Sequence, residues 1–221
     1  HRRLLEVLIA SELGIACIVG TENATKVLRT GQMVTVDTTG SEGFVFDGKL
    51  KFLVREHDVK KLPKPKTKIM VNIATPDTAF EKSFLPAEGV GLAREEFIIA
   101  GEIGVHPNAL IAYKDKKTID RKLKTEIEKQ IVGWKDAEQF YVDKLAYGIA
   151  KIGTAFYPRE VIVRFSDFKT NEYRTLLGGE LFEPKEENPM LGWRGASRYY
   201  HPSFAAAFAL ECRAMRKVRD E

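Results

Sequence analysis

The chain has 221 residues, of which 44% are hydrophobic and 30% are charged, as expected for a globular protein that buries one large core or two smaller ones. Thirty-five Lys and Arg against 31 Asp and Glu leave a net charge of +4, too small for binding nucleic acid by bulk charge. No apolar run approaches the roughly 20 residues that cross a bilayer, and no signal-peptide pattern opens the chain. Cys17 and Cys212 form no CxxC pair, so we expect a reducing, cytoplasmic location without disulfides.

The first part of the chain consists of short apolar segments separated by glycines. Strands are predicted for 15–19, 33–37 and 43–46, and a short helix is predicted for 23–28. This alternation indicates a small α/β domain, which we place at residues 1–54.

The composition changes at residues 55–67, where lysines and two prolines follow one another. Pro63 and Pro65 exclude a helix interior, and the lysines keep the segment in water. No aromatic residues interleave with these lysines, so a linker is favoured over a nucleic-acid-binding patch. We therefore expect no nucleic-acid partner, and a second domain over residues 68–221.

The second domain alternates between strand and helix patterns. The predicted strands are 68–74, 89–93 and 161–165, and the predicted helices are 77–85, 117–152 with a break near Gly133, and 203–221. We expect the strands to be buried on both faces, as in a parallel sheet. This order is typical of a (β/α) barrel or an open doubly wound sheet. Because three strands cannot close an eight-stranded barrel, we expect the chain to be part of a longer protein, truncated at both ends.

Two of these predicted strands lead into an arginine. Arg94 follows the segment GLA, and Arg164 follows VIV. The carboxyl ends of parallel strands form the ligand-binding edge of α/β sheets, and guanidinium groups suit phosphate or carboxylate. Two arginines there predict an anionic ligand. The alternative is that each arginine pairs with a local carboxylate, Glu95, Glu96 or Asp167.

Three further polar residues are candidates for the same site. Arg194 lies in the turn-forming segment NPMLGWRG before the last helix, where a structural role is the simpler interpretation. Asp167 and Lys169 directly follow the third strand, and the spacing does not decide whether they hold Arg164 or contact a ligand. Other motifs are lacking, because the histidines show no metal-ligand spacing and there is no P-loop, GxGxxG or GxSxG segment.

Four segments together resemble the PEP-utilising enzyme family, in particular its phosphoenolpyruvate synthase branch. They are residues 88–98, 103–107, 161–173 and 187–195, and residues 11–21 resemble the end of the family's swivelling phosphohistidine domain. The resemblance implies an α/β fold in which the C-terminal part of a swivelling domain precedes the first βα units of a TIM (β/α)8 barrel. The wording SDFKTNE favours the synthases over the dikinases that use inorganic phosphate and the phosphotransferase-system enzymes, which stay open as alternatives.

The resemblance also implies a reaction and its participants. ATP, pyruvate and water would give phosphoenolpyruvate, AMP and phosphate through a phosphohistidine. The family's phosphate and pyruvyl ligands correspond to Arg94, Arg164 and Arg194, and Asp167 and Lys169 would support them. Mg²⁺ is the implied cofactor, with its ligands outside this chain. ATP would bind a separate N-terminal domain, and a homo-oligomer is implied, with no membrane partner.

One departure from the family concerns its phosphorylated histidine. Leu5 stands at that position, and His1 lies four residues too early to take its place. Cys212 lies on a predicted helix and does not correspond to the family's proton donor. We therefore expect no catalytic residue in this chain and no turnover by it alone. A remnant without catalysis, which binds PEP-like anions or a partner protein, remains the alternative.

Overall fold

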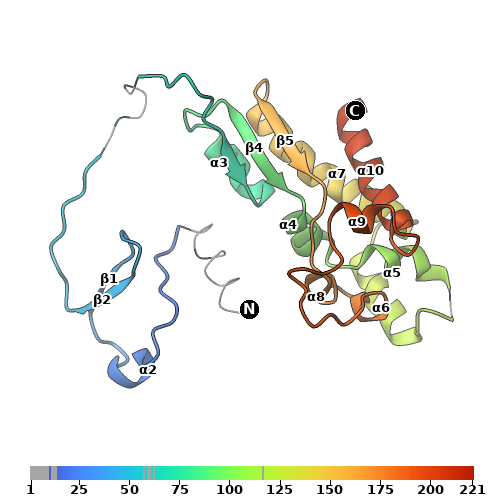
Figure 1. The fold of residues 1–221 in the computed structure, drawn as a ribbon, viewed down its shortest axis with the longest axis horizontal. Helices are drawn as coiled ribbons and strands as arrows, with labels where there is room; N and C mark the ends of the chain where they lie inside the picture. The colour runs from blue at the N-terminus through green and yellow to red at the C-terminus, as the bar shows by residue number, and fades with distance from the viewer. Residues whose placement is uncertain (1–9, 11–13, 57, 59–60, 62, 116) are drawn as a thin grey trace. The chain divides into compact units, whose positions relative to one another are not determined.

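The computed structural model describes residues 10, 14–56, 58, 61, 63–115 and 117–221 (Figure 1). The chain divides into two compact units, His1–Leu62 and Pro63–Glu221. Leu5, at the position of the family's phosphohistidine, lies outside the described residues, as does His1.

The first unit contains one short helix and one hairpin. Helix α2 spans Ala24–Val27, and strands β1 (Val34–Asp37) and β2 (Phe44–Asp47) pair antiparallel. The predicted strand at 15–19 is wrong, because these residues form no ladder with the hairpin. None of the unit's described residues is fully buried, so the core of the described chain lies in the second unit.

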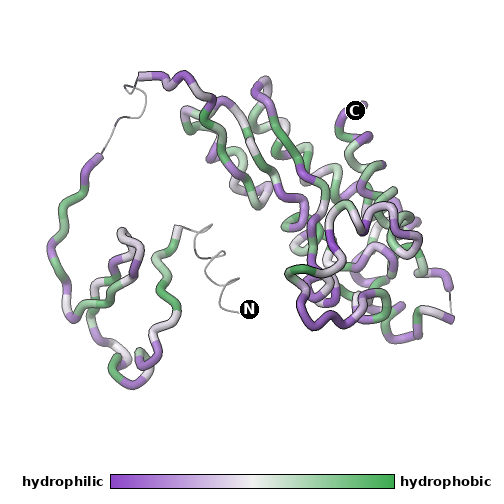
Figure 2. Tube along the Cα trace, in the orientation of Figure 1, coloured by the Kyte–Doolittle hydropathy of each residue, from purple (hydrophilic) through white to green (hydrophobic). Residues whose placement is uncertain are grey.

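The second unit is built on a parallel sheet of three strands in the order β3-β4-β5. They span Val71–Ile73, Gly89–Arg94 and Glu160–Arg164. Figure 2 shows hydrophobic stretches running through this sheet. The mixed α/β class with a parallel sheet is thereby confirmed.

The prediction that the strands are buried on both faces is wrong for β3, in which Asn72 is exposed, and for β5, whose residues alternate between exposed and half-buried. Strand β5 lies at the edge of the described sheet, where its outer side meets no other described strand. Period-2 alternation of this kind is what an edge strand with one covered face produces.

Helices cover the sheet and fill the remainder of the unit. They are α3 (Ala79–Lys82), α4 (Glu96–Ile98), α5 (Pro107–Ile111), α6 (Arg121–Gln130), α7 (Ala137–Phe156), α8 (Thr170–Tyr173), α9 (Ala196–Tyr199) and α10 (Ala205–Asp220). A π-helical turn at Ile99–Ile103 continues α4. The sequence predicted α3, α6, α7 and α10 but not α4, α5, α8 and α9, each of which has five residues or fewer.

The break in the predicted helix 117–152 is confirmed, and its cause is local. Gly133 adopts a φ of 92°, in the left-handed region that favours glycine. The side chain of Asp120 accepts a hydrogen bond from the Leu123 N–H and begins α6, and Asp136 does the same for α7 through Glu138. Two capped helices therefore replace one long helix.

Helix α7 is the central element of the core. Its buried face packs against α10, α5 and α3. Gly148 lies on this face, where an added Cβ would lie 2.7 Å from Ile98 Cγ2. The helix that follows β4 therefore approaches α7 closely at a position where only glycine leaves room.

Alanine substitutions at two glycines of α7 test this packing. Gly148→Ala is expected to lower the free energy of unfolding by about 1–3 kcal/mol, because the new methyl group overpacks the contact with Ile98. Gly153→Ala meets nothing within 4 Å and is expected to raise it by about 0.5–1 kcal/mol through helix propensity. Urea unfolding measures both changes, and a stabilising Gly148→Ala would contradict the close approach.

Candidate anion-binding site

Arg94 and Arg164 are aligned at the carboxyl ends of β4 and β5. Their Cα atoms are partners in the parallel ladder, so both side chains leave the sheet at the same edge. The guanidinium carbon of Arg94 lies 4.7 Å from the centre of the Phe97 ring. Within the described residues no carboxylate forms an ion pair with Arg94, so its N–H donors are available.

Arg164 contacts two carboxylates. Its Nη2 donates to Glu96 Oε1, and its Nη1 lies 3.9 Å from Asp167 Oδ2. Glu96 Oε1 also accepts the Asp167 backbone N–H at 2.9 Å, which joins the start of α4 to the loop after β5. The local-carboxylate alternative therefore describes Arg164, although 42% of its side chain remains exposed.

Arg194 forms a two-bond fork with the same aspartate. Its Nε donates to Asp167 Oδ1 at 2.9 Å, and its Nη2 donates to Oδ2 at 2.7 Å. These hydrogen bonds hold the pKa of Asp167 below its ordinary value, with smaller contributions from Arg164 and Lys169. Asp167 therefore stays ionised at neutral pH and connects Arg164 with Arg194.

Lys169 lies at the start of α8, close to this cluster but bonded elsewhere. Its Nζ is 3.8 Å from Glu172 Oε1, and its backbone N–H donates to Glu172 Oε2 at 2.9 Å. Its charge contributes to the low pKa of Asp167 through space. Lys169 therefore adds positive potential at Asp167, although its own ion pair is with Glu172.

The loop that carries Arg194 is held by a buried ion pair. Arg198 is 1% exposed, and its Nη2 donates to Glu183 Oε2 at 2.8 Å and to the Trp193 backbone oxygen at 3.0 Å. The guanidinium also lies 4.0 Å from the centre of the Trp193 ring. Because Trp193 directly precedes Arg194, these contacts of Arg198 fix the backbone next to Arg194.

His106 completes the environment of Glu183. Its Nδ1 accepts the Asn108 backbone N–H, so Nε2 carries the proton and donates to Glu183 Oε1 at 3.0 Å. Burial lowers the pKa of His106, which is therefore neutral, and the charge of Glu183 is balanced by Arg198. Sequence reasoning missed this group, because its members are separated by up to 92 positions and form no motif.

Glu186 holds the other side of the same loop. Its Oε1 accepts the Trp193 backbone N–H at 2.8 Å, and its Oε2 accepts the hydroxyl of Thr170. A Cβ on Gly192 would lie 2.1 Å from Glu186 Oε2, so the glycine in GWR allows the carboxylate to approach the backbone. The sequence marked this segment only as a glycine-containing turn, and it did not indicate that Glu186 is the group that approaches Gly192.

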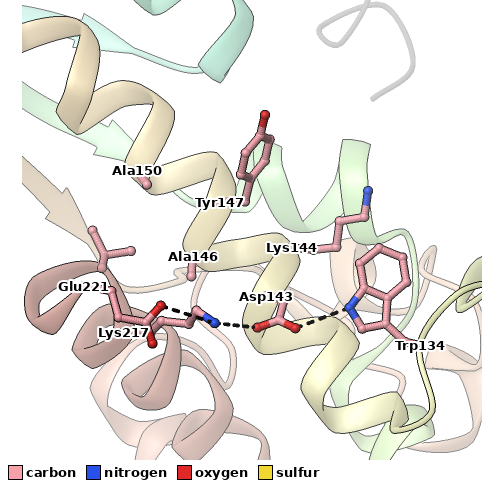
Figure 3. Close-up of a pocket in the computed structure, with 9 residues that line it drawn as sticks. Trp134, Asp143, Lys144, Ala146, Tyr147, Ala150, Lys217 and Glu221 are labelled. Carbon is pink, nitrogen blue, oxygen red and sulfur yellow. Dashed lines mark hydrogen bonds and ion pairs between the residues drawn. The ribbon is translucent and has the colours of Figure 1, made fainter.

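A cavity of about 510 Å³ lies elsewhere, between α7 and the end of α10 (Figure 3). Asp143 stands in it between two donors, Trp134 Nε1 at 3.3 Å and Lys217 Nζ at 3.0 Å. The lining includes none of the three candidate arginines. The cavity is therefore separate from the arginine cluster.

Two further properties of the described residues concern metal ions and membranes. No group of three or more His, Cys, Asp or Glu side chains in this part of the chain could hold a metal ion. None of its helices combines the length and the hydrophobicity needed to cross a bilayer.

Comparison with known proteins places both units. Residues 53–221 match the PEP-binding domain of PEP-utilising enzymes, and residues 7–41 match the mobile domain of the same enzymes. The chain belongs to the PEP-utilising enzyme family. The segments that carried the resemblance in the second unit, and the three arginines, fall within the matched PEP-binding domain.

Curated relatives in this family are phosphoenolpyruvate synthases. The chain is 53% identical over 215 residues to that of Pseudomonas aeruginosa, 49% over 215 residues to that of Escherichia coli, and 46% over 258 residues to that of Aquifex aeolicus. Each match covers 97% of this chain, but only 27%, 27% and 30% of the respective relative. The predicted resemblance is confirmed, and the chain spans less than a third of the length of these relatives.

The buried ion pair behind Arg194 predicts a large effect on stability. Glu183→Leu leaves Arg198 charged and buried without its partner, and is expected to lower the free energy of unfolding by about 3–5 kcal/mol. Glu138→Leu is the control, because it breaks the exposed pair with Arg213 and is expected to cost less than about 1 kcal/mol. Chemical unfolding compares the two, and equal losses would contradict the importance of burial.

Proposed function

We propose that this chain binds phosphoenolpyruvate and pyruvate at the carboxyl edge of β4 and β5, as the PEP-binding part of a phosphoenolpyruvate synthase. The observation that carries the proposal is the alignment of Arg94 with Arg164, together with the fork that joins Arg194 to the same cluster through Asp167. Three guanidinium groups against two carboxylates leave an excess of positive charge, which suits a ligand with several negative charges.

The cluster offers different roles to its arginines. Arg94 has no ion pair among the described residues and so has free donors for a phosphate group. Arg164 and Arg194 are already oriented by Glu96 and Asp167, so less side-chain freedom is lost when they bind. In phosphoryl transfer, charge spreads over the equatorial oxygens, and fixed donors stabilise it without reorganisation. Lys169 adds positive potential from α8.

The reaction we propose is that of the relatives' branch of the family. ATP, pyruvate and water give phosphoenolpyruvate, AMP and phosphate, and the arginines hold pyruvate and the group in transfer. Strands β3, β4 and β5 would be the first strands of a TIM barrel, and residues 7–41 would belong to the swivelling domain. The names of the relatives favour this reaction over those of the inorganic-phosphate dikinases and the phosphotransferase enzymes.

The other participants in the proposed reaction, which are Mg²⁺, ATP and a phosphohistidine, are proposed only because the chain belongs to this family. No group of three or more His, Cys, Asp or Glu side chains among the described residues could hold a metal ion, so we place the Mg²⁺ ligands outside this chain and assign it no metal-dependent step. ATP would be bound by a separate domain. Because Leu5 cannot be phosphorylated as the family's histidine is, the phosphohistidine would have to come from outside this chain. A homo-oligomeric, cytoplasmic enzyme is the setting that we propose for the whole assembly.

Calorimetric titration with phosphoenolpyruvate tests the arginine site directly. Arg164→Ala is expected to weaken binding about 10- to 100-fold, because a charge-assisted hydrogen bond contributes about 1.5–3 kcal/mol. Arg213→Ala removes the same charge from the exposed face of α10 and is expected to leave the affinity within about twofold. Equal affinity of Arg164→Ala and the wild type would remove the basis of the proposal.

A further inference from the structure

Two buried glutamates contact one backbone amide beside the candidate arginines. Glu95 and Glu211 are both fully buried. The Ser166 N–H donates to Glu95 Oε1 at 2.7 Å and to Glu211 Oε2 at 3.3 Å, and the Ser166 hydroxyl donates to Glu211 Oε1 at 2.7 Å. The segments that follow β4 and β5 therefore meet α10 at Ser166, although they are far apart in the sequence.

The surroundings of this pair lack a balancing cation. In the described chain no Lys, Arg or His forms an ion pair with Glu95 or Glu211, and Glu95 Oε2 is buried without a donor. Two ionised carboxylates in such a place would each lose their hydration and repel one another. A proton on Glu95, donated to Glu211, removes the repulsion, because the two side chains then share a hydrogen bond.

The groups that face the pair from neighbouring elements do not supply a positive charge. They are Tyr141 on α7, Tyr173 on α8, Tyr199 on α9, Glu96 on α4 and Cys212 on α10. Burial and the two glutamates raise the pKa values of these tyrosines, which therefore stay neutral. Burial and the charge of Glu211 raise the pKa of Glu95 well above its ordinary value, and burial raises that of Glu211.

The pair is connected to all three arginine-bearing segments. Glu95 directly follows Arg94, and Ser166 lies between Arg164 and the loop that begins at Asp167. The Tyr199 hydroxyl, on the helix after Arg194, donates to the Ser166 backbone oxygen at 2.7 Å. A displacement of Ser166 would therefore change the relative positions of the three guanidinium groups.

We propose that Glu95 and Glu211 share one proton at neutral pH and act as positioning residues for Arg94, Arg164 and Arg194. Loss of the shared proton at alkaline pH places two charges in the buried site, loosens Ser166 and weakens anion binding. The last step rests on the proposed function, whereas the shared proton is a property of the pair alone.

Infrared spectroscopy of the chain, with ¹³C-labelled glutamate carboxyl groups, tests the proton first. At pH 7 the wild type is expected to show the band of a protonated carboxyl, and Glu95→Gln is expected to lack it. Glu128→Gln, at an exposed carboxylate on α6, is expected to keep the band. A wild type without the band at pH 7 overturns the proposal, whatever it binds.

Unfolding provides a second check that needs no ligand. Above about pH 4.5 the unfolded chain has released the proton of Glu95, whereas the native pair retains it until its own, raised pKa is reached. Stability therefore falls as pH rises through this interval, and the unfolding equilibrium constant of the wild type increases about tenfold per pH unit relative to Glu95→Gln. Identical pH dependence of the two proteins overturns the shared proton.

The positioning role is tested by binding of phosphoenolpyruvate across the same pH range. Where the infrared band disappears, the wild type is expected to lose about tenfold or more in affinity. Glu95→Gln is expected to change less than about twofold there, because its amide donates to Glu211 at every pH. Parallel losses in both proteins overturn the positioning role. A wild type that shows the band but binds no phosphoenolpyruvate at any pH supports the shared proton and refutes the proposed function.

Discussion

The parallel pairing of β4 with β5 is the constraint on which the rest of the site depends. Its register makes Arg94 and Arg164 neighbours and brings Glu95 and Glu96 to the loop after β5. The two consecutive glutamates then serve opposite purposes. Glu96 pairs with the guanidinium of Arg164, and Glu95 is fully buried, where it meets the carboxyl group of Glu211. Of these adjacent residues, Glu96 thus orients Arg164, and Glu95 binds the Ser166 backbone beneath the arginines.

Much of the fold could be predicted from the periodicity of the sequence, and the predictions that were wrong or missing have physical causes. The long amphipathic segment around α7 and the apolar strand β4 carry strong local patterns, so their existence and type followed from the sequence. The segment 15–19 is equally apolar but has no ladder partner, and a strand requires one. The four-residue helices α8 and α9 depend on tertiary contacts, which periodicity cannot register.

The candidate site was predictable in part. Arg94, Arg164 and Arg194 could be selected because strand ends and a glycine turn mark them, and the family match covers all three. Their connections were not predictable, because the same sequence is compatible with Asp167 pairing with either arginine or with a ligand. The groups behind the site, Glu183 with Arg198 and Glu95 with Glu211, join residues far apart in the chain, and only the folded structure brings them together.

The outer side of β5 has a practical consequence for solution work. Its main-chain amides and carbonyls meet no other strand among the described residues, and Ile162 beside them is 47% exposed. Such an edge can add an extended segment of another molecule. Self-association through this strand would grow with protein concentration and would change the fraction of molecules free to take up a ligand. Dilution series are therefore as informative for this chain as the titrations themselves.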